Sequence, residues 1–188
     1  MIDDQNLTDE QIVKIIQKGN VEAFEILVNR LQEKLLRYIK RLVFDNNDAE
    51  DILQNVFIKA YQNIMGFNFD YKFSSWIYRI AHNESVNYLR LLNKRPIFNI
   101  EWDILFPINV SKNEIGEEID KESLSKWIQD NLKNIDKKYQ EVLSLYYLED
   151  MSYKDISDVL QIPIATVGVR IKRAKNIMKN NYNKQIKK

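Results

Sequence analysis

Several residue types are scarce in this chain of 188 residues, and each scarcity excludes a class of protein. Cysteine is absent, which removes disulfide frameworks, thiolate zinc sites and cysteine nucleophiles. Only four glycines and three prolines occur, so helix is favoured over a β-sandwich. No apolar run approaches the ~20 residues of a membrane-spanning helix, and the acidic first ten residues lack the basic start of a secretion signal. We therefore expect a soluble cytoplasmic protein.

Catalytic motifs are also missing. The chain contains no G-x-x-x-x-G-K-[ST] loop, no G-x-S-x-G elbow and no H-E-x-x-H pair. The only histidine, His82, has no second histidine or cysteine with which to form a metal site. An enzyme is the chief rival class of function, and the sequence offers it little. We expect no catalytic residue, no cofactor, no metal and no small-molecule substrate.

Charge of one sign is not in excess overall, since the formal net charge is +1, but the sign alternates along the chain. Residues 1–60 hold 8 basic and 11 acidic side chains, and residues 61–98 hold 5 and 2. Residues 99–150 hold 6 and 12, and residues 151–188 hold 9 and 2. Two separate basic blocks predict two surfaces that face polyanions rather than one basic tail.

The first half of the chain has the apolar periodicity of helices. From Phe24 to Leu42, apolar residues recur at spacings of three and four, which predicts one long helix with a buried face. Capping and stop signals mark the other expected helix ends: Thr8 with Gln11, Gly19-Asn20, Asn47 with Glu50, Gly66, and Ser74 or Ser75. Residues 1–95 therefore predict a domain of four helices.

Periodicity fades over residues 96–122, which predict a flexible linker. Its apolar part, which includes Ile100 and Trp102, is expected either to dock on this chain or a partner, or to form a hydrophobic turn under the first domain. Helical spacing resumes in residues 123–188. The predicted fold class is all-α, with two small helical domains joined by a flexible linker and a helix-turn-helix in the C-terminal domain.

The stretch QIPIATVGVRIKRAK, residues 161–175, carries four basic residues and no acidic one. Ser152 with Asp155 caps a short helix before it, and Pro163 requires a turn. The next helix is expected to start at Ala165 or Thr166 and to bury the stripe Val167, Ile171, Ala174 and Met178. The outer arc then contains Thr166, Val169, Arg170, Lys172, Arg173 and Lys175. This arrangement favours a helix-turn-helix shaped for the major groove, and the alternative is a helical hairpin with solvated cations.

Three segments resemble a known family. The segment NIDKKYQEVLSLYYLEDMSYKDISDVLQIPIATVGVRIKRAK resembles the C-terminal promoter-binding domain of bacterial RNA polymerase sigma factors. The segments DAEDILQNVFIKAYQNI and FSSWIYRIAHNESVNYLR resemble their N-terminal core domain. The order and separation are those of the extracytoplasmic-function group, and the resemblance covers about residues 7–180.

The resemblance implies that the helix in DAEDILQNVFIKAY binds the clamp helices of core RNA polymerase. Ile52 and Val56 are expected to face inward, and Asn55 stands where the family commonly has an acidic residue. The residues implied to bind polymerase are Asp48, Glu50, Asp51, Gln54 and Asn55. The alternative is an ordinary solvated helix face.

The same domain is implied to read the minus-ten promoter element as melted single-stranded DNA. That task requires aromatic faces for unpaired bases and cations for phosphates. In the family, the loop before FSSW holds a flipped-out base, and an asparagine that matches Asn83 helps to read it. Phe73 and Trp76 are expected in the core. The predicted minus-ten residues are Phe67, Phe69, Tyr71, Lys72, Arg79, Asn83 and Arg90.

The basic helix is implied to read the minus-thirty-five element as duplex DNA. Base contacts are expected from Val169, Lys172 and Arg173, with Thr166, Arg170 and Lys175 nearer phosphates. Gln161 replaces a frequent turn glycine, and it is strained if the turn requires a left-handed residue.

The expected function is that of a sigma factor, which binds core polymerase and promoter DNA and directs initiation. The resemblance also implies an anti-sigma factor as a partner. The alternative is a stand-alone helix-turn-helix regulator that binds operators as a dimer, which leaves the aromatic and basic segment 67–95 unexplained.

Overall fold

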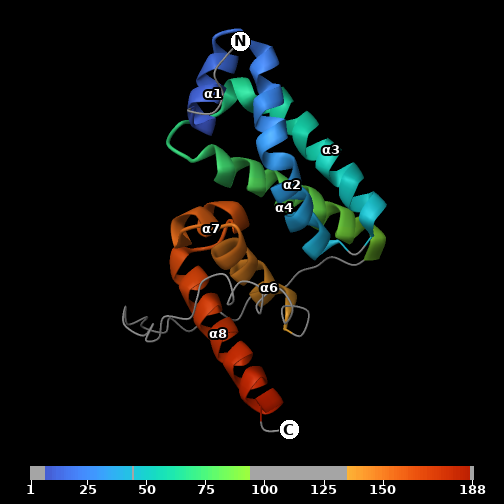
Figure 1. Cartoon of the computed structure of the whole chain (residues 1–188), viewed down its shortest axis with the longest axis vertical. Helices are drawn as coiled ribbons and strands as arrows, with labels where there is room; N and C mark the ends of the chain where they lie inside the picture. Colours follow the sequence, from blue (N-terminus) through green and yellow to red (C-terminus); the bar gives the residue numbers. More distant parts are fainter. Residues whose placement is uncertain (1–6, 44, 94–134, 187–188) are drawn as a thin grey trace. The chain divides into compact units, whose positions relative to one another are not determined.

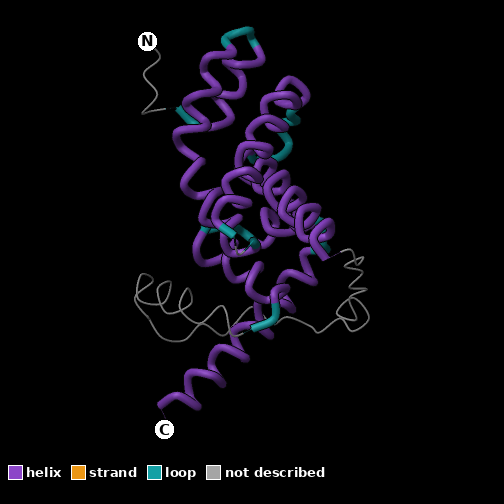
Figure 2. Tube along the Cα trace, turned by 90° about the vertical axis from the view of Figure 1, so that its right-hand side faces the viewer, coloured by secondary structure: helices purple, strands orange, loops and turns teal. Residues whose placement is uncertain are grey.

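A computed structural model describes residues 7–43, 45–93 and 135–186. Within these ranges the regular elements are all helical and no strand occurs, which confirms the predicted all-α class (Figures 1 and 2). One compact unit is built from α1 to α4, and a second from α6, η6, α8 and the greater part of α7. The expected linker, 96–122, and the helix expected around Trp127 lie outside the described residues.

The first unit consists of four α-helices, as the periodicity predicts. These are α1 (Asp9–Gln17), α2 (Phe24–Leu42), α3 (Asn46–Asn63) and α4 (Phe73–Asn93), with short 3-10 turns η2 (Val21–Ala23) and η3 (Ile64–Gly66). Each helix turns an apolar face inward, so that one core forms between them. Its largest fully buried side chains include Ile12, Ile16, Leu27, Leu35, Tyr38, Ile39, Ile64, Phe73 and Ile77.

The capping signals located the first helix correctly and two later helices imprecisely. Thr8 and Gln11 form the expected capping box at the start of α1. Gly19, with a φ of 106°, follows the C-terminal end of the same helix, as expected. The prediction that Asn47 and Glu50 cap α3 is wrong, because Asp45 is the N-cap. Its carboxylate accepts hydrogen bonds from the backbone N–H groups of Asn47 at 2.8 Å and Asp48 at 3.3 Å. Asp45 precedes Asp48 by three residues, which is itself a capping pattern.

The start of α4 is capped from another helix. The prediction that Ser74 or Ser75 caps it is wrong, because the helix begins at Phe73. The backbone N–H of Phe73 donates to Oε1 of Glu10, which belongs to α1, at 2.9 Å. A carboxylate at this position satisfies one of the N–H groups that a helix start leaves without an intrahelical acceptor.

The second unit contains the predicted helix-turn-helix. Its elements are α6 (Lys137–Leu143), a π-helical turn η6 (Ser144–Leu148), α7 (Tyr153–Leu160) and α8 (Ile164–Ile186). Ser152 and Asp155 form the predicted capping box of α7. The stripe Val167, Ile171, Ala174 and Met178 is buried, as predicted, and two of these residues pack with Ile135, Tyr139 and Leu143 in one cluster.

The turn between α7 and α8 is left-handed at Gln161, with φ 55° and ψ 42°. The turn thus requires a left-handed residue, which is the condition under which strain is expected at a position where glycine is frequent. The hydroxyl of Ser157 donates to the carbonyl oxygen of Ile162 at 2.6 Å and closes the turn. α8 then begins at Ile164, directly after Pro163 and one or two residues before the expected start at Ala165 or Thr166.

Candidate functional site

The acidic and amide face predicted on α3 is exposed. Asp51, Gln54 and Asn55 lie at the surface, whereas Ile52 and Val56 are buried, as expected. The predicted residues near the start of α3, Asp48 and Glu50, instead make contacts within the first unit. Three polar side chains on one exposed side of a helix form a surface that a partner protein can contact.

Asp48 and Glu50 make contacts within the first unit. The Tyr88 hydroxyl of α4 donates a short hydrogen bond to Oδ2 of Asp48. This bond, followed by desolvation and the negative charges of Asp48 and Asp45, raises the pKa of Tyr88 to about 12. Glu50 lies 3.8 Å from Nζ of Lys40 in an ion pair. Asp48 is half-buried, so its first contribution is to fix the start of α3 against α4.

Phe67 lies in the aromatic core, which corrects its prediction as an accessible stacking residue. Its side chain is 5% exposed, and its ring centroid lies 5.6 Å from that of Phe73 and 5.4 Å from that of Trp76. Phe73 is fully buried, as expected, while Trp76 is half-buried. Residues in a loop have no regular period, so the spacing of the rings did not distinguish buried from exposed ones.

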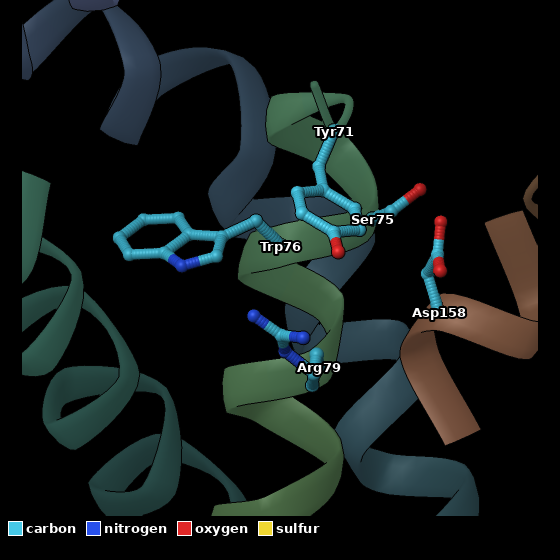
Figure 3. Close-up of a pocket in the computed structure, with 5 residues that line it drawn as sticks. All are labelled: Tyr71, Ser75, Trp76, Arg79 and Asp158. Atoms are coloured by element: carbon cyan, nitrogen blue, oxygen red, sulfur yellow. The ribbon is translucent and has the colours of Figure 1, made fainter. Parts of the chain in front are cut away.

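Phe69 and Tyr71 are the exposed rings of the loop, at 39% and 43%. Asn68 accepts a hydrogen bond from the backbone N–H of Asp70 at 2.9 Å and so shapes the tip of the loop. The rings of Phe69 and Phe67 are nearly perpendicular, with their centroids 5.1 Å apart. Figure 3 shows Tyr71 beside Ser75 at the N-terminal end of α4, and Trp76 and Arg79 projecting from successive turns. The loop thus presents an exposed aromatic surface near the cation of Arg79.

The predicted polar minus-ten residues follow one stripe along α4. Arg79, Asn83 and Arg90 are spaced by four and seven residues, which brings them to within about 40° of one another around the helix axis. Lys72 immediately precedes the helix and is exposed, as are Asn83 and Arg90. Nη1 of Arg90 lies 3.4 Å from Oδ1 of Asn87. The structure therefore brings the cations and the asparagine together on the face that continues from the loop.

Sequence reasoning missed the contribution of α1 to this loop. Gln17, Lys14 and Glu10 of α1 all contact residues between Ile64 and Phe73. These contacts join residues between 47 and 63 positions apart in the chain. Local spacing gives no signal for such pairs, so only the folded chain can reveal them.

On α8, Lys172 is exposed and Arg173 is half-buried. The prediction that Thr166, Val169 and Arg170 lie on an exposed arc is wrong, because they are 6%, 5% and 4% exposed. Burial lowers the pKa of the Arg170 guanidinium. Val167 and Val169 lie nearly opposite each other on a helical wheel, and both are buried. The first turns of α8 are thus covered on more than one side. The expected exposed arc assumed a helix that is buried along one stripe only.

Lys175 lies over aromatic rings rather than projecting alone into solvent. Its Nζ is 5.5 Å from the ring centroid of Tyr146 and 5.4 Å from that of Tyr147, both in η6. Tyr153 of α7 meets Tyr146 at 5.5 Å. We call Tyr146, Tyr147 and Tyr153 the tyrosine cluster. Burial raises the pKa of Tyr147, and burial also raises that of Tyr153 against the opposing charge of Lys175. The ring contact between Tyr146 and Tyr153 joins η6 to α7, and the cation of Lys175 joins η6 to α8.

Among the described residues, no group of histidine, aspartate and glutamate is arranged to hold a metal ion. The same part of the chain contains no helix with the length and apolarity required to cross a membrane.

Comparison with known proteins identifies both units. Residues 27–95 match the model of Sigma-70 region 2, and residues 125–178 match that of Sigma-70, region 4. The ECF RNA polymerase sigma-E factor of Haemophilus influenzae is 32% identical over 94% of this chain and 96% of its own length. The ECF RNA polymerase sigma factor SigW of Bacillus subtilis is 30% identical over 89% of this chain and 92% of its own.

Solved structures share the fold. CnrH, solved in complex with the cytosolic domain of CnrY, matches with a TM-score of 0.64 and 21% identity over 92% of this chain and 95% of its own. The sigma factor RpoE of Bartonella quintana, solved in complex with the anti-sigma factor NepR, matches with a TM-score of 0.61 and 20% identity over 84% and 94%.

The two matched regions and the relatives that match over nearly the whole chain assign it to the factors that direct transcription initiation at promoters. The matches over nearly its whole length show that this chain belongs to the ECF group of RNA polymerase sigma factors. A stand-alone helix-turn-helix regulator is not favoured, because it leaves the region 2 match unexplained.

Proposed function

We propose that this sigma factor binds core RNA polymerase through α3, captures melted minus-ten bases with α4 and the segment that precedes it, and reads the minus-thirty-five element with α8. We call that segment, from the end of α3 to the first residue of α4, the 64–73 loop. The observation that carries the proposal is the stripe Arg79, Asn83 and Arg90 on α4, with Lys72 just before the helix and the exposed rings of Phe69 and Tyr71 in the loop. Aromatic faces stack on unpaired bases, and cations contact the phosphates between them. A duplex-binding protein alone has no need of that combination.

The polymerase contact is proposed for Asp51, Gln54 and Asn55 first, because these side chains are exposed on one side of α3. Asp48 and Glu50 flank them, and the internal contacts of both residues orient the first turn. We expect that Asp51→Ala combined with Gln54→Ala weakens binding to core polymerase without loss of helix. Glu33→Ala on α2 is the matched control, because that side chain is 83% exposed. Equal binding by both variants would remove α3 from the interface.

The minus-thirty-five contact is proposed for Lys172, which is exposed, and for Arg173, which is half-buried. An arginine can pair with guanine through two hydrogen bonds. Thr166, Val169 and Arg170 join them only if their buried side chains become accessible, and Lys175 only if it leaves the tyrosine cluster. These four residues are therefore the weaker part of the predicted set.

We also propose that the protein carries no catalytic group or cofactor of its own, acts in the cytoplasm and is controlled by an anti-sigma factor. The synthesis of RNA then belongs entirely to the polymerase. Support for the partner comes from RpoE of Bartonella quintana, which has the same fold and was solved with the anti-sigma factor NepR.

Run-off transcription tests the proposal. Core polymerase free of other sigma factors is mixed with the full chain and a library of genomic fragments, and the start sites are mapped. We expect initiation at a small set of sites that share two sequence elements. Initiation at random sites, or none above core polymerase alone, would refute the proposal. Tight dimeric binding to duplex DNA without polymerase would instead support the regulator.

A further inference from the structure

We propose that α1 positions the 64–73 loop and thereby determines which base the loop prefers. The proposal rests on the proposed function of that loop as the site of an unpaired minus-ten base. Region 2 is matched only from residue 27 onward, so α1 (Asp9–Gln17) lies outside the matched segment. The loop runs close to α1 in the first unit (Figure 1).

Gln17 fixes the beginning of the loop. Its Nε2 donates to the carbonyl oxygen of Ile64 at 2.9 Å and lies 3.3 Å and 3.4 Å from those of Met65 and Phe67. Carbonyl oxygens at a helix end lack intrahelical donors, and the side-chain amide supplies one. One side chain therefore holds three carbonyl groups, all within four residues, where the chain passes from α3 into the loop.

Glu10 fixes the end of the loop. Its Oε1 accepts the hydrogen bond from the backbone N–H of Phe73, at the first residue of α4. This bond determines where α4 begins, and it sets the direction in which the chain leaves Tyr71 and Lys72. Gln17 and Glu10 together hold both ends of the same loop from one helix.

Lys14 contacts the middle of the loop. Its Nζ lies 5.1 Å from the ring centroid of Phe69, within the range of a cation–π contact. Lys14 is exposed, and Phe69 is 39% exposed. The contact orients the ring and leaves a positive charge beside it, where the phosphate of a strand bound to this ring gains an electrostatic contact.

Glu10, Lys14 and Gln17 occupy one face of α1, since four and seven residues correspond to nearly whole turns. Ile12 and Ile16 lie on the other side and Val13 lies at the edge of this face, and all three are buried in the core. α1 is itself anchored, because Nη1 of Arg30 contacts the carbonyl oxygen of Leu7 at 2.7 Å and Oδ1 of Asp9 at 3.1 Å. An anchored helix with one face on a loop acts as a template for the conformation of that loop.

The test selects single-stranded DNA with the assembled enzyme. Core polymerase with the full chain retains a pool of fork-junction oligonucleotides whose unpaired strand is randomised at six positions, and the retained pool is sequenced. The variants are Gln17→Met, which keeps length and loses the donor, and Lys14→Ala. Lys18→Ala is the matched control, because Lys18 has the same charge, is exposed and ends the same helix.

We expect Gln17→Met to reduce the enrichment of the preferred base at one or two neighbouring positions by about tenfold. Lys14→Ala is expected to reduce it by about twofold to fivefold, and Lys18→Ala leaves it unchanged. If Gln17→Met lowers thermal stability but retains the wild-type motif at wild-type enrichment, α1 has only a structural role and the inference is wrong. Lys14→Ala decides alone if Gln17→Met does not fold. Failure of the wild-type holoenzyme to enrich any motif would instead refute the proposed function.

Discussion

Replacement of Gln161 by glycine is expected to stabilise the helix-turn-helix. Gln161 adopts φ 55° and ψ 42°, where an L-residue with a Cβ atom costs about 1–2 kcal/mol. Glycine removes that strain but adds roughly 0.4–1 kcal/mol of conformational freedom to the unfolded chain. The difference predicts an increase of about 0.5–1 kcal/mol in the free energy of unfolding.

Differential scanning calorimetry of the full chain measures this gain. For a unit of this size, the expected increase corresponds to a rise of about 2–8 °C in the Tm of the transition that includes α6 to α8. Gln161→Asn is expected to give part of the gain, since asparagine tolerates the left-handed region. Gln161→Ala is expected to give none, because alanine keeps the Cβ atom.

A second left-handed residue provides an internal control. Asp150 has a φ of 52°, and aspartate tolerates this region better than glutamine does. Asp150→Gly is therefore expected to stabilise the unit less than Gln161→Gly. An equal or lower Tm for Gln161→Gly than for the wild type would refute the reasoning, because it would mean that the turn stores no strain at Gln161.

Three other substitutions test individual contacts. Tyr88→Phe is expected to remove from the absorbance titration a phenol that titrates near pH 12, and an unchanged titration would contradict the assigned bond. Because the pKa of Tyr88 is raised in the folded state, its contribution to the stability of the fold is complete below pH 10 and is lost as the pH rises through about 12. Lys175→Ala is expected to cost about 0.5–1 kcal/mol in urea unfolding and to leave the salt dependence of promoter binding unchanged, whereas a slope reduced by about 1 would make Lys175 a phosphate contact. Arg173→Ala is expected to weaken binding to minus-thirty-five duplex by about 1–3 kcal/mol at a guanine contact, with core polymerase affinity as the control, and equal loss of both would contradict the assignment.

The helices were predictable because their signals are local. The capping pair Thr8 and Gln11 and the stripe from Val167 to Met178 are determined by residues within a few turns of one another. The turn before α8 was predictable for the same reason, because Pro163 lies in it, although the left-handed conformation of Gln161 is known only from the structure. Even the shift of the α3 cap to Asp45 is a local error, since an aspartate three residues before Asp48 gives the same pattern.

The parts that were not predictable depend on contacts between distant residues. Glu10 caps a helix that starts 63 residues later, and no spacing in the sequence links the two. Phe67 and Phe69 are two residues apart in one loop, yet one is 5% and the other 39% exposed, because only Phe67 reaches the aromatic core. Val169 was placed on the surface by its angle on the helix, and that angle does not record what covers the first turns of α8.

Two polar contacts between α3 and α4 have a consequence for recombination among related proteins. Tyr88 of α4 binds Asp48 of α3, and Nζ of Lys59 on α3 lies 2.6 Å from Oε1 of Glu84 on α4. A chimaera that exchanges α3 alone separates each of these residues from its present partner. The natural unit of exchange is the whole helical hairpin from Asp45 to Asn93, which transfers the proposed enzyme-facing and strand-facing surfaces together.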